Sequence, residues 1–135
     1  MRSYRDEILR IAEERYGTEP EYPWAKYPNF AVLRHGVSGK WYALIADVPK
    51  NKLGLDGHER VDILNVRCGP LLAGSPRTEP GYLPAYHMNK GNWISILLDG
   101  TVSPDQIAPL LEMSYDYAGG TPRKKRVRKD SRTDG

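Results

Sequence analysis

The sequence predicts an α+β domain in which two helices cover one face of an antiparallel β-sheet. Three observations lead to this fold class. Helical spacing of apolar residues marks two segments, 3–16 and 104–118, on either side of a region rich in strand-like runs. Two of these runs are separated by a short Gly-containing loop, as in a β-hairpin. The order helix, hairpin, strand, long loop, strand, helix is typical of α+β proteins, and 135 residues suffice for one domain.

The first helix is expected to span 3–16 with Ser3 as its N-cap. Asp6 follows three residues later, so that each side chain can pair with a backbone N–H that the first turn leaves open. Gly17 suits the left-handed conformation that ends many helices. The segment 18–29 contains three prolines and is expected to be an irregular connector.

The sheet is expected to contain four strands, at 30–35, 40–46, 61–67 and 92–98. A turn-rich stretch at 49–57 and a long loop at 76–91 connect them, and a short helix is expected within 69–74. From the strand and helix periodicities, the residues expected to be buried include Leu44, Ile63, Ile96, Ile107 and Leu111.

The last helix, 104–118, has a strong start signal. Ser103 is the expected N-cap, Pro104 suits the first helical position, and Gln106 completes a capping box. Pro109 falls inside the helix, where proline removes a hydrogen bond and costs about 3 kcal/mol. The pair Gly119-Gly120 is expected to end it.

The net charge of +3 divides unevenly between a domain, 1–118, and a tail, 119–135. The domain carries 13 Lys and Arg against 15 Asp and Glu, whereas the tail carries seven against two. With almost no apolar content, the tail is expected to be disordered. Its basic residues are Arg123, Lys124, Lys125, Arg126, Arg128, Lys129 and Arg132.

Composition also bears on localisation. No apolar run approaches the length of a transmembrane helix, and the N-terminus lacks the apolar region of a signal peptide. Cys68 is the only cysteine, which excludes an internal disulfide and suits a reducing compartment. We therefore expect a cytoplasmic monomer that does not associate with membranes.

Several segments resemble the MmcQ/YjbR family in order and spacing: GYLPAYHMNK at 81–90, WISILLDG at 93–100, PNFAV at 28–32, KWYALI at 40–45 and VDILNV at 61–66. The resemblance covers residues 3–118 and implies a frataxin-like, or CyaY-like, fold of one sheet and two helices. It also implies DNA binding, the activity suggested for the family from a double-wing arrangement. The family offers no established reaction from which catalytic residues could be carried over.

The loop 87–90 with Trp93 is the first of three candidate nucleic-acid-binding sites. Lys90 would contact a phosphate, His87 would donate a hydrogen bond, and an exposed Trp93 would stack on a base. The alternative is structural. Trp93 would then fill the core while His87 satisfies backbone groups of the loop.

The hairpin supplies the second candidate site, with Arg34, Lys40 and Trp41 around its turn. A two-stranded wing with basic and aromatic residues can lie in a DNA groove. Alternatively, the hairpin is solvated and Trp41 packs inward. The basic tail is the third candidate, either as a non-specific phosphate-binding segment or as a solubilising extension.

Other chemistry has less support in the sequence. The histidines and Cys68 lack the spacing of a zinc motif, and arginines interleave the acidic residues of the first helix, which favours a salt-bridged surface over an iron site. No catalytic arrangement is recognised, so we expect no metal and no cofactor. Two functions stay open: weak, salt-dependent, non-sequence-specific DNA binding, or a protein-interaction or small-ligand-binding module without a nucleic-acid role.

Overall fold

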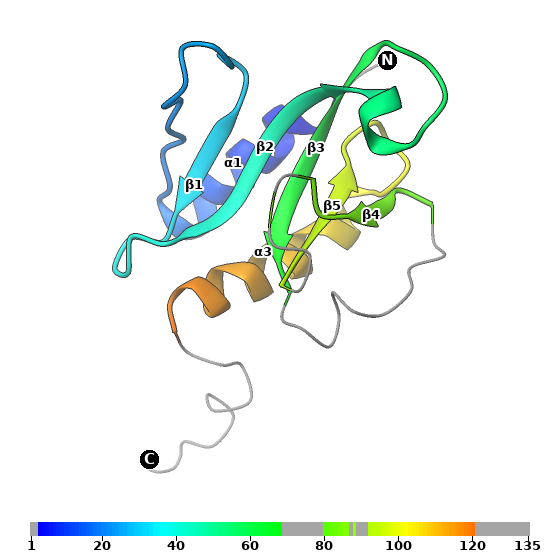
Figure 1. Ribbon diagram of the computed structural model, residues 1–135. Helices are drawn as coiled ribbons and strands as arrows, with labels where there is room; N and C mark the ends of the chain where they lie inside the picture. Colours follow the sequence, from blue (N-terminus) through cyan, green and yellow to red (C-terminus); the bar gives the residue numbers. More distant parts are fainter. Residues whose placement is uncertain (1–2, 69–79, 87, 89–91, 121–135) are drawn as a thin grey trace.

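The chain folds into a five-stranded antiparallel sheet with two helices on one face (Figure 1). The computed structural model describes residues 3–68, 80–86, 88 and 92–120. Its elements are α1 (Arg5–Tyr16), β1 (Ala31–Arg34), β2 (Trp41–Pro49), the 3-10 helix η1 (Lys50–Leu53), β3 (Arg60–Arg67), β4 (Tyr82–Pro84), β5 (Trp93–Leu97) and α3 (Pro104–Ala118). The strand order is β1-β2-β3-β5-β4, and each neighbouring pair is antiparallel. The predicted α+β class is confirmed.

The strands differ from the prediction in two places. β2 continues to Pro49 and leads into η1, so part of the expected turn-rich stretch is regular structure. The expected loop at 76–91 contains β4, which pairs with β5 at the sheet edge. An edge strand tolerates Pro84 because its outer side needs no hydrogen-bond donor. The short helix expected within 69–74 and the disorder expected from residue 121 onward lie outside the described residues.

The start of α3 is as predicted. Ser103 Oγ accepts a hydrogen bond from the Gln106 backbone N–H at 3.3 Å, and Gln106 Oε1 accepts one from the Ser103 N–H at 3.2 Å. Pro104 occupies the first turn, and the helix continues through Pro109. The capping box thus fixes where the C-terminal helix begins.

The start of α1 differs from the prediction. The helix begins at Arg5, and its N-cap, Tyr4, makes no side-chain capping bond. Ser3 precedes the helix: its hydroxyl donates to Asp62 Oδ2 on β3 at 2.6 Å and accepts a hydrogen bond from the Arg5 backbone N–H at 3.0 Å. At the other end Gly17 adopts the left-handed conformation, with φ of 66°, as predicted.

Apolar residues fill both sides of the sheet. The larger cluster lies beneath the helices and joins Ile8 of α1 and Ile107 of α3 to Ile45 and Leu64 in the strands. A smaller cluster on the other side includes Val48 and neighbouring residues of β3 and β5. The predicted burial is confirmed for all five residues named from the sequence: Leu44, Ile63, Ile96, Ile107 and Leu111.

A β-bulge ends the regular pairing of β1 with β2. Leu33 pairs with Ala43, but Arg34 pairs with Trp41, so Tyr42 is the extra residue. Tyr42 turns to the same side as Ala43 and enters the core beneath the helices. Because successive strand residues point to opposite faces, Trp41 is directed to the face without helices. The bulge therefore assigns these two aromatic side chains to different faces.

A serine of α3 bridges β2 and β3 beside this bulge. The regular pairing of the two strands ends at Ala43 and Val66. Next to that pair, the buried Ser114 Oγ accepts a hydrogen bond from the Arg67 backbone N–H at 2.7 Å and donates one to the Tyr42 carbonyl. One hydroxyl thus satisfies a donor on one strand and an acceptor on the other.

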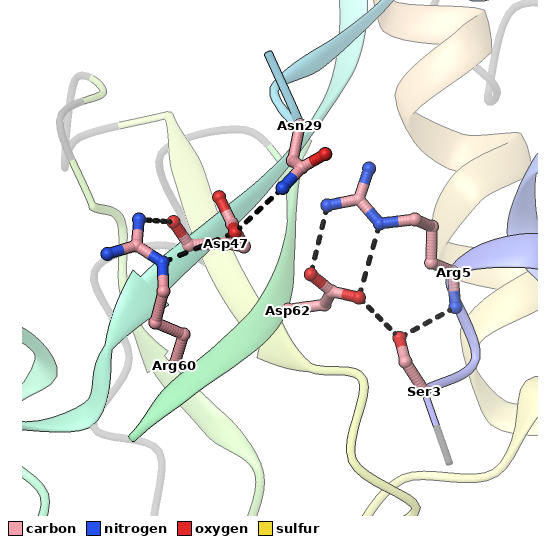
Figure 2. A network of polar contacts seen from close by, with 6 residues as sticks. All are labelled: Ser3, Arg5, Asn29, Asp47, Arg60 and Asp62. Carbon is pink, nitrogen blue, oxygen red and sulfur yellow. Dashed lines mark hydrogen bonds and ion pairs between the residues drawn. The ribbon is translucent and has the colours of Figure 1, made fainter. Parts of the chain in front are cut away.

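Two carboxylates face each other across β2 and β3, and each has its own arginine (Figure 2). Arg5 donates to Asp62 through Nη2 at 2.9 Å and Nε at 3.2 Å, which ties the start of α1 to the sheet. Arg60 Nε donates to Asp47 Oδ2 at 3.2 Å, and Asn29 Nδ2 donates to the same oxygen at 3.1 Å. Without these partners, directly opposed carboxylates would repel each other.

The surroundings of Asp47 shift its pKa. Burial raises the pKa of this carboxyl. Hydrogen bonds from Arg60 and Asn29 and the charges of Arg60 and Arg5 together lower the pKa by more than burial raises it, so the net shift is downward. A depressed folded-state pKa means that the ionised form stabilises the fold. This contribution is present above the unfolded pKa, about 3.9, and is lost as the pH falls through the folded value.

We therefore expect Asp47→Asn to lower the free energy of unfolding at pH 7 and to lower it less at pH 2, because protonation of Asp47 in the parent removes the same charge as the pH falls. Urea unfolding at the two pH values measures the difference. The exposed Asp56 has no ion pair in the described part of the chain, so Asp56→Asn is the control. Equal effects of Asp47→Asn at both pH values would contradict this assignment.

Truncation of the core should be costly. Ile96→Ala or Leu111→Ala is expected to lower the free energy of unfolding by about 2–5 kcal/mol, because each removes fully buried methyl groups and leaves a cavity. Denaturant unfolding followed by circular dichroism measures it. Val37, 92% exposed in the hairpin turn, supplies the control Val37→Ala, expected to stay within about 0.5 kcal/mol of the parent. Unchanged midpoints for the core variants would show that the core is assigned wrongly.

Candidate functional site

A row of alternating arginine and tryptophan crosses the sheet at its hairpin end. Arg34 on β1 pairs with Trp41 on β2, and Arg67 on β3 pairs with Trp93 on β5. The Arg34 guanidinium carbon lies 5.8 Å from the Trp41 ring centre, and that of Arg67 lies 5.0 Å from the Trp93 ring centre. Arg67 Nε also donates to the Trp41 carbonyl at 2.7 Å, which joins the two pairs. We call these four residues the Arg–Trp row.

The two arginines of the row differ in their charge environment. Arg34 is exposed, and its Nε donates to Glu21 Oε1 at 2.9 Å, so its charge is compensated. Arg67 is half-buried and has no ion pair with any residue that the structure describes. Burial lowers the pKa of Arg67, and no acidic neighbour in the described part of the chain opposes this shift. Of the two arginines in the row, Arg67 is therefore the one whose positive charge is not compensated by a described residue.

Aromatic residues extend the row beyond β1. Trp24, from the connector after α1, packs edge-on against Trp41 with ring centres 5.7 Å apart and against Phe30 at 6.1 Å. Tyr27 stacks on Phe30 at 4.9 Å and stays 45% exposed. The connector thus presents a partly exposed aromatic surface beside the Arg–Trp row.

The C-terminal end of α3 is fastened to the hairpin turn. Ser38 Oγ donates to the Ala118 carbonyl at 2.7 Å, and the His35 ring packs on Tyr115 at 4.3 Å. His35 Nδ1 accepts hydrogen bonds from the turn, including the Ser38 N–H at 3.1 Å. A Cβ at Gly119 would lie 2.6 Å from His35 Nε2, so this close approach requires glycine. Figure 1 shows the orange end of α3 beside the cyan hairpin turn.

The structure brings together four of the candidate residues named from the sequence. Arg34 and Trp41 belong to the row, and the exposed Lys40 lies in the adjoining hairpin. Trp93 is 6% exposed, so its ring has no free face on which a base could stack. The ring instead packs under the Arg67 guanidinium. The candidates that lie outside the described residues are His87, Lys90, Arg123, Lys124, Lys125, Arg126, Arg128 and Lys129.

Sequence reasoning missed Arg67. Its only signal in the sequence is a charged residue near the end of an otherwise apolar strand, and that pattern usually marks a solvated strand end. The contacts that distinguish it, with the Trp41 carbonyl and the Trp93 ring, come from two other strands. They depend on the bulge and on strand register, which a single sequence does not display.

A polar cavity lies at the opposite end of the sheet. It has a volume of about 530 Å³ and is lined by both carboxylates of the Asp47–Asp62 pair and by Lys50 and Glu59. Lys50 pairs with Glu59 at 3.3 Å, and the two aspartates hold their own arginines, so these charges compensate one another. Within the described residues no three His, Cys, Asp or Glu side chains are grouped to hold a metal ion. The described lining of the cavity therefore shows no metal-binding arrangement.

The described residues also bear on two further expectations. None of their helices is long and apolar enough to cross a membrane. Cys68 is 3% exposed at the end of β3 and belongs to the core beneath the helices, as a small apolar residue would.

Comparisons with known proteins agree with the fold. The chain is 43% identical to a protein from Pseudomonas syringae whose crystal structure superposes with a TM-score of 0.81, over 84% of this chain and 97% of that one. A Deinococcus radiodurans crystal structure shares the fold at 22% identity and a TM-score of 0.64, over 93% and 86% of the two chains.

The sequence comparisons identify the family. An uncharacterized Bacillus subtilis protein, YyaQ, is 49% identical over 111 residues, which is 82% of this chain and 94% of that protein. The YjbR family model matches residues 14–117, a range that includes all four residues of the Arg–Trp row. The chain is therefore a member of the YjbR family, as the resemblance in its motifs implies.

Proposed function

We propose that this protein binds DNA weakly and without sequence preference at the hairpin end of its sheet. The basic segment 119–135 supplies most of the attraction, and the hairpin supplies an additional contact through Lys40. The observation that carries the proposal is the bond from Ser38 Oγ to the Ala118 carbonyl, because it holds the residue immediately before the basic segment against the hairpin.

The distribution of charge supports this division of roles. The described residues carry ten Lys and Arg against fourteen Asp and Glu, whereas residues 119–135 carry seven against two. A folded domain with net negative charge does not attract a polyanion by itself. The attraction must then come from the basic segment, and the domain adds local contacts where it carries uncompensated cations.

Salt dependence is the most direct signature of such binding. If about five to seven basic residues contact phosphates, the slope of log K against log[salt] should be about −4.5 to −6, at about 0.9 per contact. Fluorescence anisotropy of a labelled duplex, titrated with full-length protein at several salt concentrations, gives the slope. A chain that ends at Gly120 retains the anchor at Ala118 and should lose most of the binding. The absence of salt-dependent binding by full-length protein at about 50 mM salt would refute the proposal.

A matched pair of lysines tests the place of contact. Lys40 in the hairpin and Lys52 in η1 are both exposed, but Lys40 precedes β2 and Lys52 follows it, so the two lie at opposite ends of that strand. Lys40→Ala in the full-length chain should reduce the salt slope by about 1, whereas Lys52→Ala should leave it unchanged. Equal effects of the two substitutions would show that the hairpin end has no special role.

The exposed aromatic surface supports a second candidate, a protein-interaction module. Tyr22 and Tyr27 are 51% and 45% exposed, and Trp24 and Phe30 are only partly buried beside them. Large aromatic residues are enriched at protein interfaces. Tyr27→Ala distinguishes the two functions, because it should leave the salt slope of DNA binding unchanged and weaken any protein contact made through this surface.

A further inference from the structure

Arg67 differs from the other half-buried cations that the structure describes. Arg5 pairs with Asp62 at 2.9 Å, and Lys50 pairs with Glu59 at 3.3 Å. Among the described residues Arg67 has no acidic partner, although its guanidinium is partly removed from water. An uncompensated charge in such a place costs stability unless an anion joins it. The fold therefore holds a cation whose counter-charge is not supplied by the described part of the chain.

The Arg67 guanidinium is held in a fixed orientation with most of its donors unused. Nε donates to the Trp41 carbonyl at 2.7 Å, and the guanidinium lies over the Trp93 ring. A guanidinium carries five N–H groups, and here one of them has a hydrogen bond in the described structure. The remaining fork matches the spacing of two oxygens on a phosphate or carboxylate. Because the side chain is already ordered, binding an oxyanion costs little additional side-chain entropy.

The surroundings of Arg67 offer a further donor and an aromatic surface. Asn65, two residues earlier on the same face of β3, is fully buried; its Oδ1 accepts a hydrogen bond from Ser95 Oγ, and its Nδ2 has no acceptor among the described residues. Trp41 and Trp24 lie beside the site as partly exposed rings. Nucleotide bases stack on such rings, which favours a phosphate carrier over a simple carboxylate.

We propose that the Arg67 guanidinium is an oxyanion-binding site of the folded domain and that its ligand is a phosphate group, either free or carried by a nucleotide. Two N–H groups of the fork bind two phosphate oxygens, and the Trp93 ring supports the guanidinium from below. The site rests on the geometry of Arg67 alone, so it stands whether or not the basic segment 119–135 binds DNA.

The test is a phosphate titration of the isotope-labelled, full-length protein at constant ionic strength, followed by NMR at the arginine Nε–Hε and tryptophan indole N–H signals. With one bidentate contact, we expect saturation with a Kd on the order of 1 mM. The largest shifts should fall on Arg67 and Trp93. No saturating shift at these two residues by about 20 mM phosphate would overturn the proposal, as would shifts confined to residues 119–135.

Two arginines of the row provide the matched variants. Both lie over a tryptophan ring, but Arg34 has Glu21 as its partner. Arg67→Gln should weaken phosphate binding by about tenfold or more, whereas Arg34→Gln should change it by less than about twofold. Arg67→Lys keeps the positive charge but loses the two-pronged guanidinium, so it should also weaken phosphate binding. This variant tests the site even if Arg67→Gln folds poorly. Equal affinities for all three variants and the parent would overturn the proposal.

A second ligand identifies the carrier of the phosphate. Under the same conditions, a thymidine trinucleotide should saturate the Arg67 and Trp93 signals at about tenfold lower concentration if a nucleotide is the ligand. Saturation at the same concentration as inorganic phosphate supports free phosphate. Removal of residues 121–135 tests whether the two proposals are independent. If duplex binding is lost and the phosphate-induced shifts of Arg67 remain, the Arg67 site does not depend on DNA binding by the basic segment.

Discussion

The hydroxyl of Ser114 links the main features of this fold. It accepts from the Arg67 N–H on β3 and donates to the Tyr42 carbonyl on β2, at the place where the regular pairing of these strands ends. Buried backbone groups left without partners would each cost about 1–3 kcal/mol. One side chain from α3 therefore allows the bulge to exist in the interior and fixes the helix against the sheet.

The bulge in turn separates the two faces of the sheet at this end. Tyr42 joins the helix-side core, where its ring packs edge-on against Tyr115 of α3 at 4.9 Å. Trp41 turns to the opposite face, and its carbonyl receives the Arg67 side chain. The bulge thus places Trp41 in the Arg–Trp row, whereas Arg67 and Trp93 pair in regular register on β3 and β5. The same end of the sheet holds the hairpin turn and the end of α3, whereas the opposite end carries carboxylates that are paired with arginine and lysine.

The sequence predicts elements whose signals are local. The capping box at Ser103 and the left-handed Gly17 are properties of neighbouring residues, and both are confirmed. Ser3 carries the local signal of an N-cap, but its hydroxyl donates to Asp62, which is distant in sequence and becomes a neighbour of Ser3 only after β3 forms. β4 was missed because three residues ending in proline have no strand periodicity of their own. For the same reason the sequence indicated Arg34, Trp41 and Trp93 separately, and neither their alignment nor the role of Arg67 could be read from it.

Hydrogen exchange in Ser114→Ala measures whether the Ser114 hydroxyl maintains the bulge. We expect the Arg67 amide to lose its protection selectively, while amides in the middle of β3 remain protected and the protein stays folded. The cross-strand contact between Arg67 and Trp41 should weaken in the same variant. An Arg67 amide that exchanges as slowly in Ser114→Ala as in the parent would show that the Ser114 hydroxyl does not maintain the bulge.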